Sequence, residues 1–218
     1  MIINPKAETG LKIARTLIEA QAILVAQSGK APFTLTSGRK SPVYIDGKKL
    51  ISYPEHRKKI ISEIVTSIQT RGLEFDYIGG IESGSIAYAA WVAEALDAPM
   101  IYLRKKPKGF GKQAQIEGEF KPGSKVLMVE DVTSDGQSKV TFTEVLRQSG
   151  GVVEDIFTIF FYNSFDYTEQ ILQKADIHLH YLSSWPFVLE MLAQESDFSQ
   201  DTLSDITNFL RAPDEWNA

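Results

Sequence analysis

Short apolar strands alternate with amphipathic helices along residues 77–162, and this alternation limits the chain to a few folds. The pattern predicts strands at Tyr77–Ile81, Met100–Leu103, Val126–Val129 and Val152–Tyr162, and helices at Ile86–Leu96 and at about Lys139–Gln148. Strands separated by helices pair in parallel, so the sequence predicts an α/β fold with a central, mostly parallel sheet flanked by helices. Ligands of such sheets bind beyond the carboxyl ends of the strands. We therefore expect the functional residues after Ile81, Leu103 and Val129.

A smaller N-terminal part is predicted before this alternation. A helix is expected from about Thr9 to Gln27, because leucine, isoleucine and valine recur there at helical spacing. Two short strands, Phe33–Leu35 and Val43–Asp46, follow on either side of a turn that contains glycine, serine and proline. Another helix is expected from Pro54 to about Thr70. No repeat or linker separates these parts, which favours a single domain.

Charge and cysteine content exclude several classes of protein. The 218 residues include 23 basic and 28 acidic side chains, and the net charge of −5 argues against nucleic acid or an anionic membrane as a partner. The absence of cysteine excludes disulfides, thiolate zinc sites and a cysteine nucleophile. The sequence shows no signal peptide, and no apolar run approaches the ~18 residues of a membrane span. A cytoplasmic protein is expected.

The acidic excess is concentrated near the C-terminus. From Glu190 onward the chain has seven acidic residues and one basic residue, Arg211. Five apolar side chains are spaced so that they form a buried stripe beneath these charges: Leu189, Leu192, Leu203, Ile206 and Leu210. We interpret this segment as a solvated helical tail.

The segment Val126–Ser138 carries the strongest signal for chemistry. Two adjacent carboxylates, Glu130 and Asp131, follow a buried strand at the point where we expect it to leave the core. A loop of small polar residues and a helix come next, and the free N–H groups of a helix N-terminus bind phosphate well. The carboxylates suit two vicinal sugar hydroxyls, so a sugar phosphate fits the whole segment. The alternative is an ordinary capped helix with solvated carboxylates.

A cluster of positive charge follows the strand Met100–Leu103. Five basic residues lie between Arg104 and Lys112, and no acidic residue occurs before Glu117. Gly109 and Gly111 make this segment pliable, as a closing lid would need to be. Its position beyond a strand end favours a polyanionic ligand over the alternative of a merely solvated loop.

These segments carry a family resemblance. Residues 126–138 resemble the thirteen-residue motif that binds 5-phosphoribosyl 1-diphosphate in type I phosphoribosyltransferases. The resemblance implies that Glu130 and Asp131 hold the ribose hydroxyls. It also implies that the following loop wraps the 5′-phosphate, and the substrate-binding residues expected in that loop are Val132, Thr133, Ser134, Asp135, Gly136, Gln137 and Ser138.

Three segments occur along the chain in the same order as in one branch of these enzymes, and they make the resemblance more specific. The sequence FTL-x-SGRKSP at residues 33–42, the lid RKKPKGFGKQAQIEG at residues 104–118 and the ribose motif resemble the orotate phosphoribosyltransferase family from about Thr9 to Tyr162. The resemblance implies the type I phosphoribosyltransferase fold with a small N-terminal hood. We expect a hood mainly in residues 1–50, a core at about 51–189 and an acidic helical tail at 190–218.

The resemblance also assigns roles to residues. The expected catalytic residues are Arg104, Lys105, Lys108 and Asp131, with the lid residues reaching the diphosphate from the neighbouring subunit of a homodimer. Lys112 is expected to bind substrate with them, and the loop Glu82, Ser83 and Gly84 to contact the diphosphate. Phe33, Tyr44 and Ile45 of the hood would cover orotate. Mg²⁺ is the expected cofactor, bound mainly through the substrate and not by protein side chains.

The implied reaction joins orotate to the phosphoribosyl group and releases diphosphate, which gives orotidine 5′-monophosphate in pyrimidine synthesis. Two alternatives stay open at this point. The chain could use another base, or it could be a regulator that binds the phosphoribosyl ligand without turnover. The second alternative arises because Phe110 stands where many family members have a lid histidine.

Overall fold

A seven-stranded sheet forms the centre of the protein. We describe residues 1–26, 31–35, 38–108, 115–194 and 199–216 in a computed structural model. The strand order is β1-β11-β10-β9-β6-β7-β8, and every neighbouring pair is parallel except β7 and β8. The strands are β1 (Ile2–Ile3), β6 (Tyr77–Ile81), β7 (Met100–Leu103), β8 (Ile116–Glu117), β9 (Val126–Thr133), β10 (Asp155–Phe161) and β11 (His178–Ser184). The predicted α/β class with a mostly parallel sheet is confirmed.

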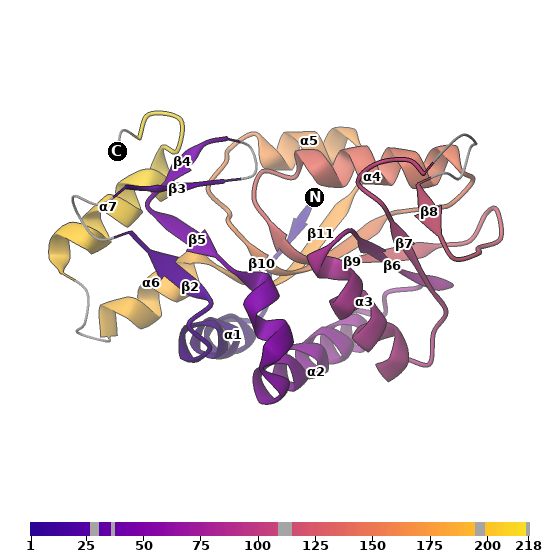
Figure 1. Cartoon of the computed structure of the whole chain (residues 1–218), viewed down its shortest axis with the longest axis horizontal. Helices are drawn as coiled ribbons and strands as arrows, with labels where there is room; N and C mark the ends of the chain where they lie inside the picture. The colour runs from indigo at the N-terminus through magenta and orange to yellow at the C-terminus, as the bar shows by residue number, and fades with distance from the viewer. Residues whose placement is uncertain (27–30, 36–37, 109–114, 195–198, 217–218) are drawn as a thin grey trace.

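Helices cover both faces of this sheet, as Figure 1 shows. One face carries α1 (Ala7–Glu19), α2 (Pro54–Arg71) and α3 (Gly84–Ala95), and the other carries α4 (Gln137–Gln148) and α5 (Thr168–Lys174). Successive side chains of β9 alternate between these two layers. Leu127 and Val129 belong to the core beneath α1–α3, whereas Val126 and Met128 belong to the core beneath α4 and α5. No helix in the described ranges has the length and apolarity to cross a bilayer.

Two small antiparallel pairs form the N-terminal part. β2 (Ile23–Val25) pairs with β5 (Val43–Ile45), and β3 (Phe33–Thr34) pairs with β4 (Lys40–Ser41). The 3₁₀ helix η1 (Gly47–Ser52) then leads into α2. The expectation of one helix from Thr9 to Gln27 is wrong beyond Glu19. Gln21 has a φ of 51°, which ends the helix, and the aliphatic run that follows hydrogen-bonds to β5 as a strand.

The acidic C-terminal segment folds beside the N-terminal strands. It comprises α6 (Trp185–Gln194), which contains the expected boundary at residue 190, and α7 (Gln200–Arg211), which lies near β3 and β4 in Figure 1. The predicted stripe is buried at Leu192 and Ile206 and half-buried at its other positions, but it is divided between two helices. Asp214 forms an ion pair with Arg39 at 2.5 Å, and the Arg39 guanidinium lies over the Phe165 ring.

The order of the strands indicates where a ligand would bind. From β6 the chain first passes through α3 to β7 on one side, and it later returns as β9 on the other side of β6. Connections that leave adjacent strands in opposite directions open a crevice at the carboxyl ends of those strands. The ends of β6 and β9 are therefore the favoured position for a site.

A polar cluster lies at the amino-terminal ends of β10 and β11, away from the predicted site. His180 is 4% exposed, and its Nε2 donates to Asp155 Oδ1 at 2.7 Å, while His178 Nδ1 lies 3.5 Å from the same oxygen. Burial by itself raises the pKa of Asp155, but the hydrogen bonds and charge of the two histidines outweigh it and lower the pKa below its usual value. This cluster joins β10 to β11 and stabilises the fold away from the predicted site.

Replacing Asp155 with Asn is expected to lower the free energy of unfolding by about 1 kcal/mol at neutral pH, because the neutral amide bonds more weakly to histidine. A carboxyl whose pKa is lower in the folded chain stabilises it above the unfolded pKa of about 3.9, and this contribution is lost as the pH falls through the folded value. The difference in the free energy of unfolding between Asp155→Asn and the parent protein should therefore shrink below about pH 4. Urea unfolding at several pH values measures this. The exposed Asp166→Asn is the control, and an equal loss at all pH values would contradict the assignment.

Candidate active site

β9 continues past the end of β6, and this difference in length creates the site. The last residue pair between β6 and β9 is Gly80 with Val129, whereas β10 accompanies β9 as far as Thr133. The expectation that the chain leaves the sheet after Val129 is therefore wrong, because β10 supplies backbone partners to the four residues that follow. On the other side β6 has already ended. The space beside Glu130–Thr133 is open for a ligand.

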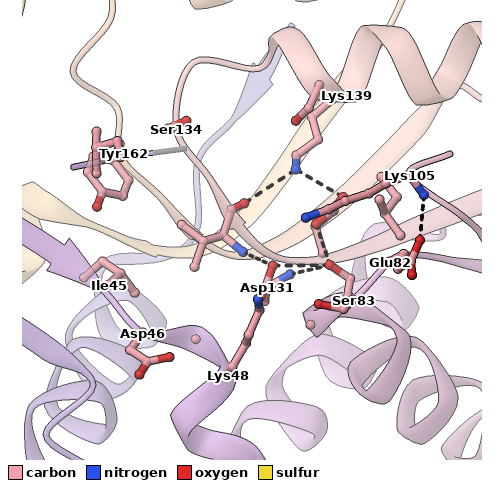
Figure 2. A pocket seen from close by; sticks show the side chains of 18 of the residues that line it. Ile45, Asp46, Lys48, Glu82, Ser83, Lys105, Asp131, Ser134, Lys139 and Tyr162 are labelled. Carbon is pink, nitrogen blue, oxygen red and sulfur yellow. Dashed lines mark hydrogen bonds and ion pairs between the residues drawn. The ribbon is translucent and has the colours of Figure 1, made fainter. Parts of the chain in front are cut away.

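A pocket of about 240 Å³ occupies this space. Its walls come from the hood, the loop after β6, the end of β9 and the start of α4. The residues that line it are Leu35, Tyr44, Ile45, Asp46, Gly47, Lys48, Ile81, Glu82, Ser83, Gly84, Ser85, Lys105, Glu130, Asp131, Val132, Ser134, Ser138, Lys139, Phe142 and Tyr162. Figure 2 shows the pocket from close by, with Asp131 near its centre and Tyr162 toward the hood.

The two adjacent carboxylates belong to opposite sides of β9, because neighbouring strand residues alternate. Glu130 follows Met128 toward α4, and Asp131 follows Val129 toward α3. Ser85, in the first turn of α3, joins them: its Oγ lies 2.5 Å from Glu130 Oε2 and 3.2 Å from Asp131 Oδ1. Glu130 is only 3% exposed. One hydroxyl therefore fixes both carboxylates at the floor of the pocket.

Lys139 is a site residue that the sequence reasoning missed. Its Nζ lies 3.1 Å from Glu130 Oε1 and 3.5 Å from the carbonyl oxygen of Val132 (Figure 2). A signal was present in the sequence, because Lys139, Thr143 and Leu146 are spaced by four and three residues and share the buried face of α4. A lysine in that stripe indicates a buried partner of opposite charge.

Burial raises the pKa of Glu130, and the charge of Asp131 acts in the same direction. The ammonium of Lys139 and the hydrogen bond from Ser85 oppose this rise. The charge of this carboxylate therefore depends on its two contacts from α4 and α3.

The loop between β9 and α4 presents hydroxyls to the pocket. Ser134 and Ser138 line it, while Thr133 is buried on the other side of the chain. Gly136 has a φ of 82°, a conformation that favours glycine and lets the chain turn into α4. Asp135 Oδ1 accepts from the backbone N–H of Gln137, the first residue of α4, at 3.1 Å, and this carboxylate does not line the pocket.

The loop after β6 passes very close to β9. A Cβ added to Gly84 would clash with Asp131 Oδ2 and would lie 3.0 Å from Lys48 Cγ, so any larger residue would displace one of these side chains. Glu82, Ser83 and Gly84 all line the pocket. Glu82 Oε2 accepts from the backbone N–H of Lys105 at 2.8 Å, which ties this loop to the beginning of the predicted lid.

The predicted lid residues do not all meet in the pocket. Lys105 lines it, but Arg104 forms an ion pair with Glu117 at 3.2 Å beside the β7–β8 pair. Lys108 is exposed and does not line the pocket. Lys112 and Phe110 lie outside the described residues.

The hood contributes the apolar wall that was expected, with one difference. Tyr44 and Ile45 line the pocket, whereas Phe33 stands behind them, its ring centroid 5.9 Å from that of Tyr44. The pocket residues that were not expected include Ser85 at the start of α3, Lys48 from η1, and Tyr162, which follows β10 and is 2% exposed. Burial raises the pKa of Tyr162 well above its usual value, so its hydroxyl stays protonated.

Within the described ranges, no group of three or more His, Asp or Glu side chains is arranged to hold a metal ion. The carboxylates nearest the pocket, Glu130 and Asp131, already share Ser85, and Glu130 also has Lys139. The donor set therefore suits a hydroxyl-bearing ligand.

Comparison with known sequences finds relatives that match most of the chain. No family model matches the chain. The chain is 41% identical over 207 residues to an orotate phosphoribosyltransferase of Allorhizobium ampelinum. The match covers 94% of this chain and 89% of the relative.

Solved structures agree as well. Orotate phosphoribosyltransferase from Aeropyrum pernix superposes with a TM-score of 0.71 at 27% identity, over 84% of this chain and 98% of that one. Leishmania donovani UMP synthase gives a TM-score of 0.77 at 26% identity over 92% of this chain, which spans only 42% of that longer protein. The chain belongs to the orotate phosphoribosyltransferase family.

Proposed function

We propose that the chain transfers a phosphoribosyl group from 5-phosphoribosyl 1-diphosphate to N1 of orotate, releasing diphosphate and forming orotidine 5′-monophosphate. This reaction is a step of pyrimidine synthesis. The observation that carries the proposal is the arrangement at the end of β9, where Glu130 and Asp131 share Ser85 directly before the hydroxyl-rich turn into α4. Family membership supports the choice of orotate over other bases.

The sugar phosphate fits the pocket in one direction. The 5′-phosphate would lie against Ser134, Ser138 and the N-terminus of α4, where hydroxyls and the positive end of the helix dipole favour an anion. The ribose hydroxyls would then reach Glu130 and Asp131. This orientation points the diphosphate toward Gly84 and Lys105.

Orotate would enter beneath the hood. Leu35, Tyr44 and Ile45 offer an apolar wall for its flat ring, and Tyr162 closes the side toward β10. Lys48, whose side chain lies beside Gly84, brings a positive charge to the pocket that suits an anionic base or the diphosphate. This arrangement would place the nucleophilic nitrogen opposite the departing diphosphate.

The transition state of such a transfer resembles a ribosyl cation, so the protein must hold both reactants in line and stabilise the leaving group. The Asp131 carboxylate beside the ribose would hold the sugar while the bond to diphosphate breaks. Mg²⁺ bound to the diphosphate and ribose oxygens of the substrate would neutralise part of the charge of the leaving group. Lys105 would add a positive charge from the protein.

The remaining lid residues are proposed to act in a homodimer. Arg104 pairs with Glu117 and Lys108 is exposed, so neither reaches the pocket of its own subunit here. Supply of these cations to the neighbouring subunit's pocket is consistent with both positions. The cytoplasmic location expected from the sequence stays a prediction.

The proposed turnover can be tested directly. Mixing the protein with orotate, the phosphoribosyl donor and Mg²⁺ should decrease orotate absorbance and yield orotidine 5′-monophosphate, and omission of Mg²⁺ should slow this strongly. Adenine and guanine serve as control bases and should give no product. Tight donor binding without turnover of any base would identify a regulator and contradict the proposal.

Gly84→Ala should weaken binding of the donor by about tenfold or more, because the added methyl group displaces Asp131 or Lys48 at a cost of about 1–3 kcal/mol. Calorimetry with the donor measures the loss. Gly72→Ala is the control for a general loss of stability: Gly72 has a φ of 63°, so alanine strains the end of α2, but nothing is within 4 Å of its added Cβ and it does not line the pocket. Unchanged donor affinity in a folded Gly84→Ala protein would disprove the placement.

Lys108→Ala should lower kcat by about 100-fold or more and leave the fold intact, because it removes a cation from the leaving group. The exposed Lys121→Ala is the control. Mixed dimers of Lys108→Ala and Asp131→Asn subunits should regain activity, since one pocket then has an intact floor and an intact lid. Failure of every mixture to regain activity would contradict sharing of the lid between subunits.

A further inference from the structure

A buried cation lies beneath the proposed sugar site. The side chains of Lys139 and Glu130 are 7% and 4% exposed, and their charged atoms are 3.1 Å apart. Ser85 Oγ donates to the other oxygen of Glu130 at 2.5 Å. The carboxylate therefore accepts a hydrogen bond at Oε2, while Oε1 lies beside the Lys139 ammonium and has no hydrogen-bond partner among the described residues.

The packing of α4 alone does not call for a lysine at this position. Its buried face continues through Thr143 and Leu146, and an apolar side chain at position 139 would extend that stripe. A buried ion pair is often no more stable than an apolar pair of similar size. A requirement for charge on Glu130 gives a direct reason for the lysine.

Other charged groups surround Glu130 from several elements. Asp131 is its neighbour on β9, Glu82 and Lys105 stand at the ends of β6 and β7, and Asp46 and Lys48 come from the hood side. The partner of Glu130 on β10 is Thr158, which has no charge. Among the described residues, Lys139 is the one cation in ion-pair contact with Glu130.

We propose that Lys139 is a positioning residue for phosphoribosyl transfer, an inference that rests on the proposed function. Its ammonium keeps Glu130 ionised and oriented, so that this carboxylate accepts a hydrogen bond from a ribose hydroxyl. Lys139 acts through Glu130 and needs no contact with the reacting atoms. Glu130 is buried and the charge of Asp131 already raises its pKa, so removal of the Lys139 ammonium would raise the pKa of this carboxyl further.

The charge on Glu130 can be measured without any ligand. In protein labelled with ¹³C at the glutamate side-chain carboxyl carbons, the Glu130 signal, assigned from Glu130→Gln, should titrate at a higher pH in Lys139→Met than in the parent. Lys139→Arg keeps the charge and should restore the parent titration. The exposed Lys174→Met on α5 is the control for loss of one positive charge. An unchanged Glu130 titration in folded Lys139→Met would overturn the proposal.

Donor binding then connects this charge to function. Calorimetry should show that Lys139→Met binds 5-phosphoribosyl 1-diphosphate about tenfold or more weakly than Lys174→Met near pH 6.5, with the difference diminishing toward pH 9 as Glu130 ionises. The double variant Lys139→Met with Glu130→Gln should lack this pH-dependent recovery. A loss that is equal at every pH would mean a structural role only and would overturn the proposal.

The two proposals fail in different ways. If the parent protein does not bind the donor, the proposed function is wrong, while the ligand-free titration still tests the pairing of Lys139 with Glu130. If the parent binds and turns over its substrates but the titration and the pH profile are unchanged in Lys139→Met, the role of Lys139 is wrong and the function stands. If Lys139→Met does not fold, Lys139→Gln and Lys139→Arg provide the same comparison.

Discussion

The site depends on the fact that β9 is paired on one side only over its last four residues. β10 continues beside Glu130–Thr133, while β6 has ended and its chain turns into the loop Glu82–Gly84. Parallel pairing with β10 keeps the backbone of β9 extended where the sequence would otherwise favour a loop. The missing neighbour leaves room for a ligand at the point where the chain direction reverses across the sheet.

This geometry also explains how two adjacent carboxylates are accommodated. On an extended strand Glu130 and Asp131 point to different sides, which separates their charges more than a turn would. Ser85 lies between them and Lys139 compensates Glu130 from the opposite layer. The close approach of Gly84 to Asp131 completes the floor, so α3, α4 and β9 jointly position a pair of acids that could not be buried without partners.

The sequence predicts four of the seven strands of the central sheet, β6, β7, β9 and β10, because these are apolar runs bounded by clear helix signals. The two-residue strands β1 and β8 are too short to give such a pattern. The sequence also predicts a site at the ends of β6 and β9, where the structure has the pocket. The N-terminal part is less predictable: the aliphatic run Ile23–Val25 suits a helix or a strand, and the choice depends on pairing with Val43–Ile45, which is distant in sequence. The end of β9 was misplaced for a similar reason, since only the neighbour β10 decides how far it extends.

The individual site residues show the same limit. The acidic pair and the loop Ser134–Ser138 stand out as a motif. Lys48, Lys139 and Tyr162 do not, because each reaches the pocket from a separate element through tertiary contacts. Phe33 and Arg104 fit the expected pattern in sequence, but packing against Tyr44 and pairing with Glu117 hold them out of the pocket in this subunit.

A crystal structure with 5-phosphoribosyl 1-diphosphate and Mg²⁺ bound is the most direct test of the role given to the end of β9. We expect the two ribose hydroxyls within about 3.2 Å of the carboxylates of Glu130 and Asp131, and the 5′-phosphate against Ser134, Ser138 and the first turn of α4. A sugar bound elsewhere, with both carboxylates turned away from it, would contradict this view of the site.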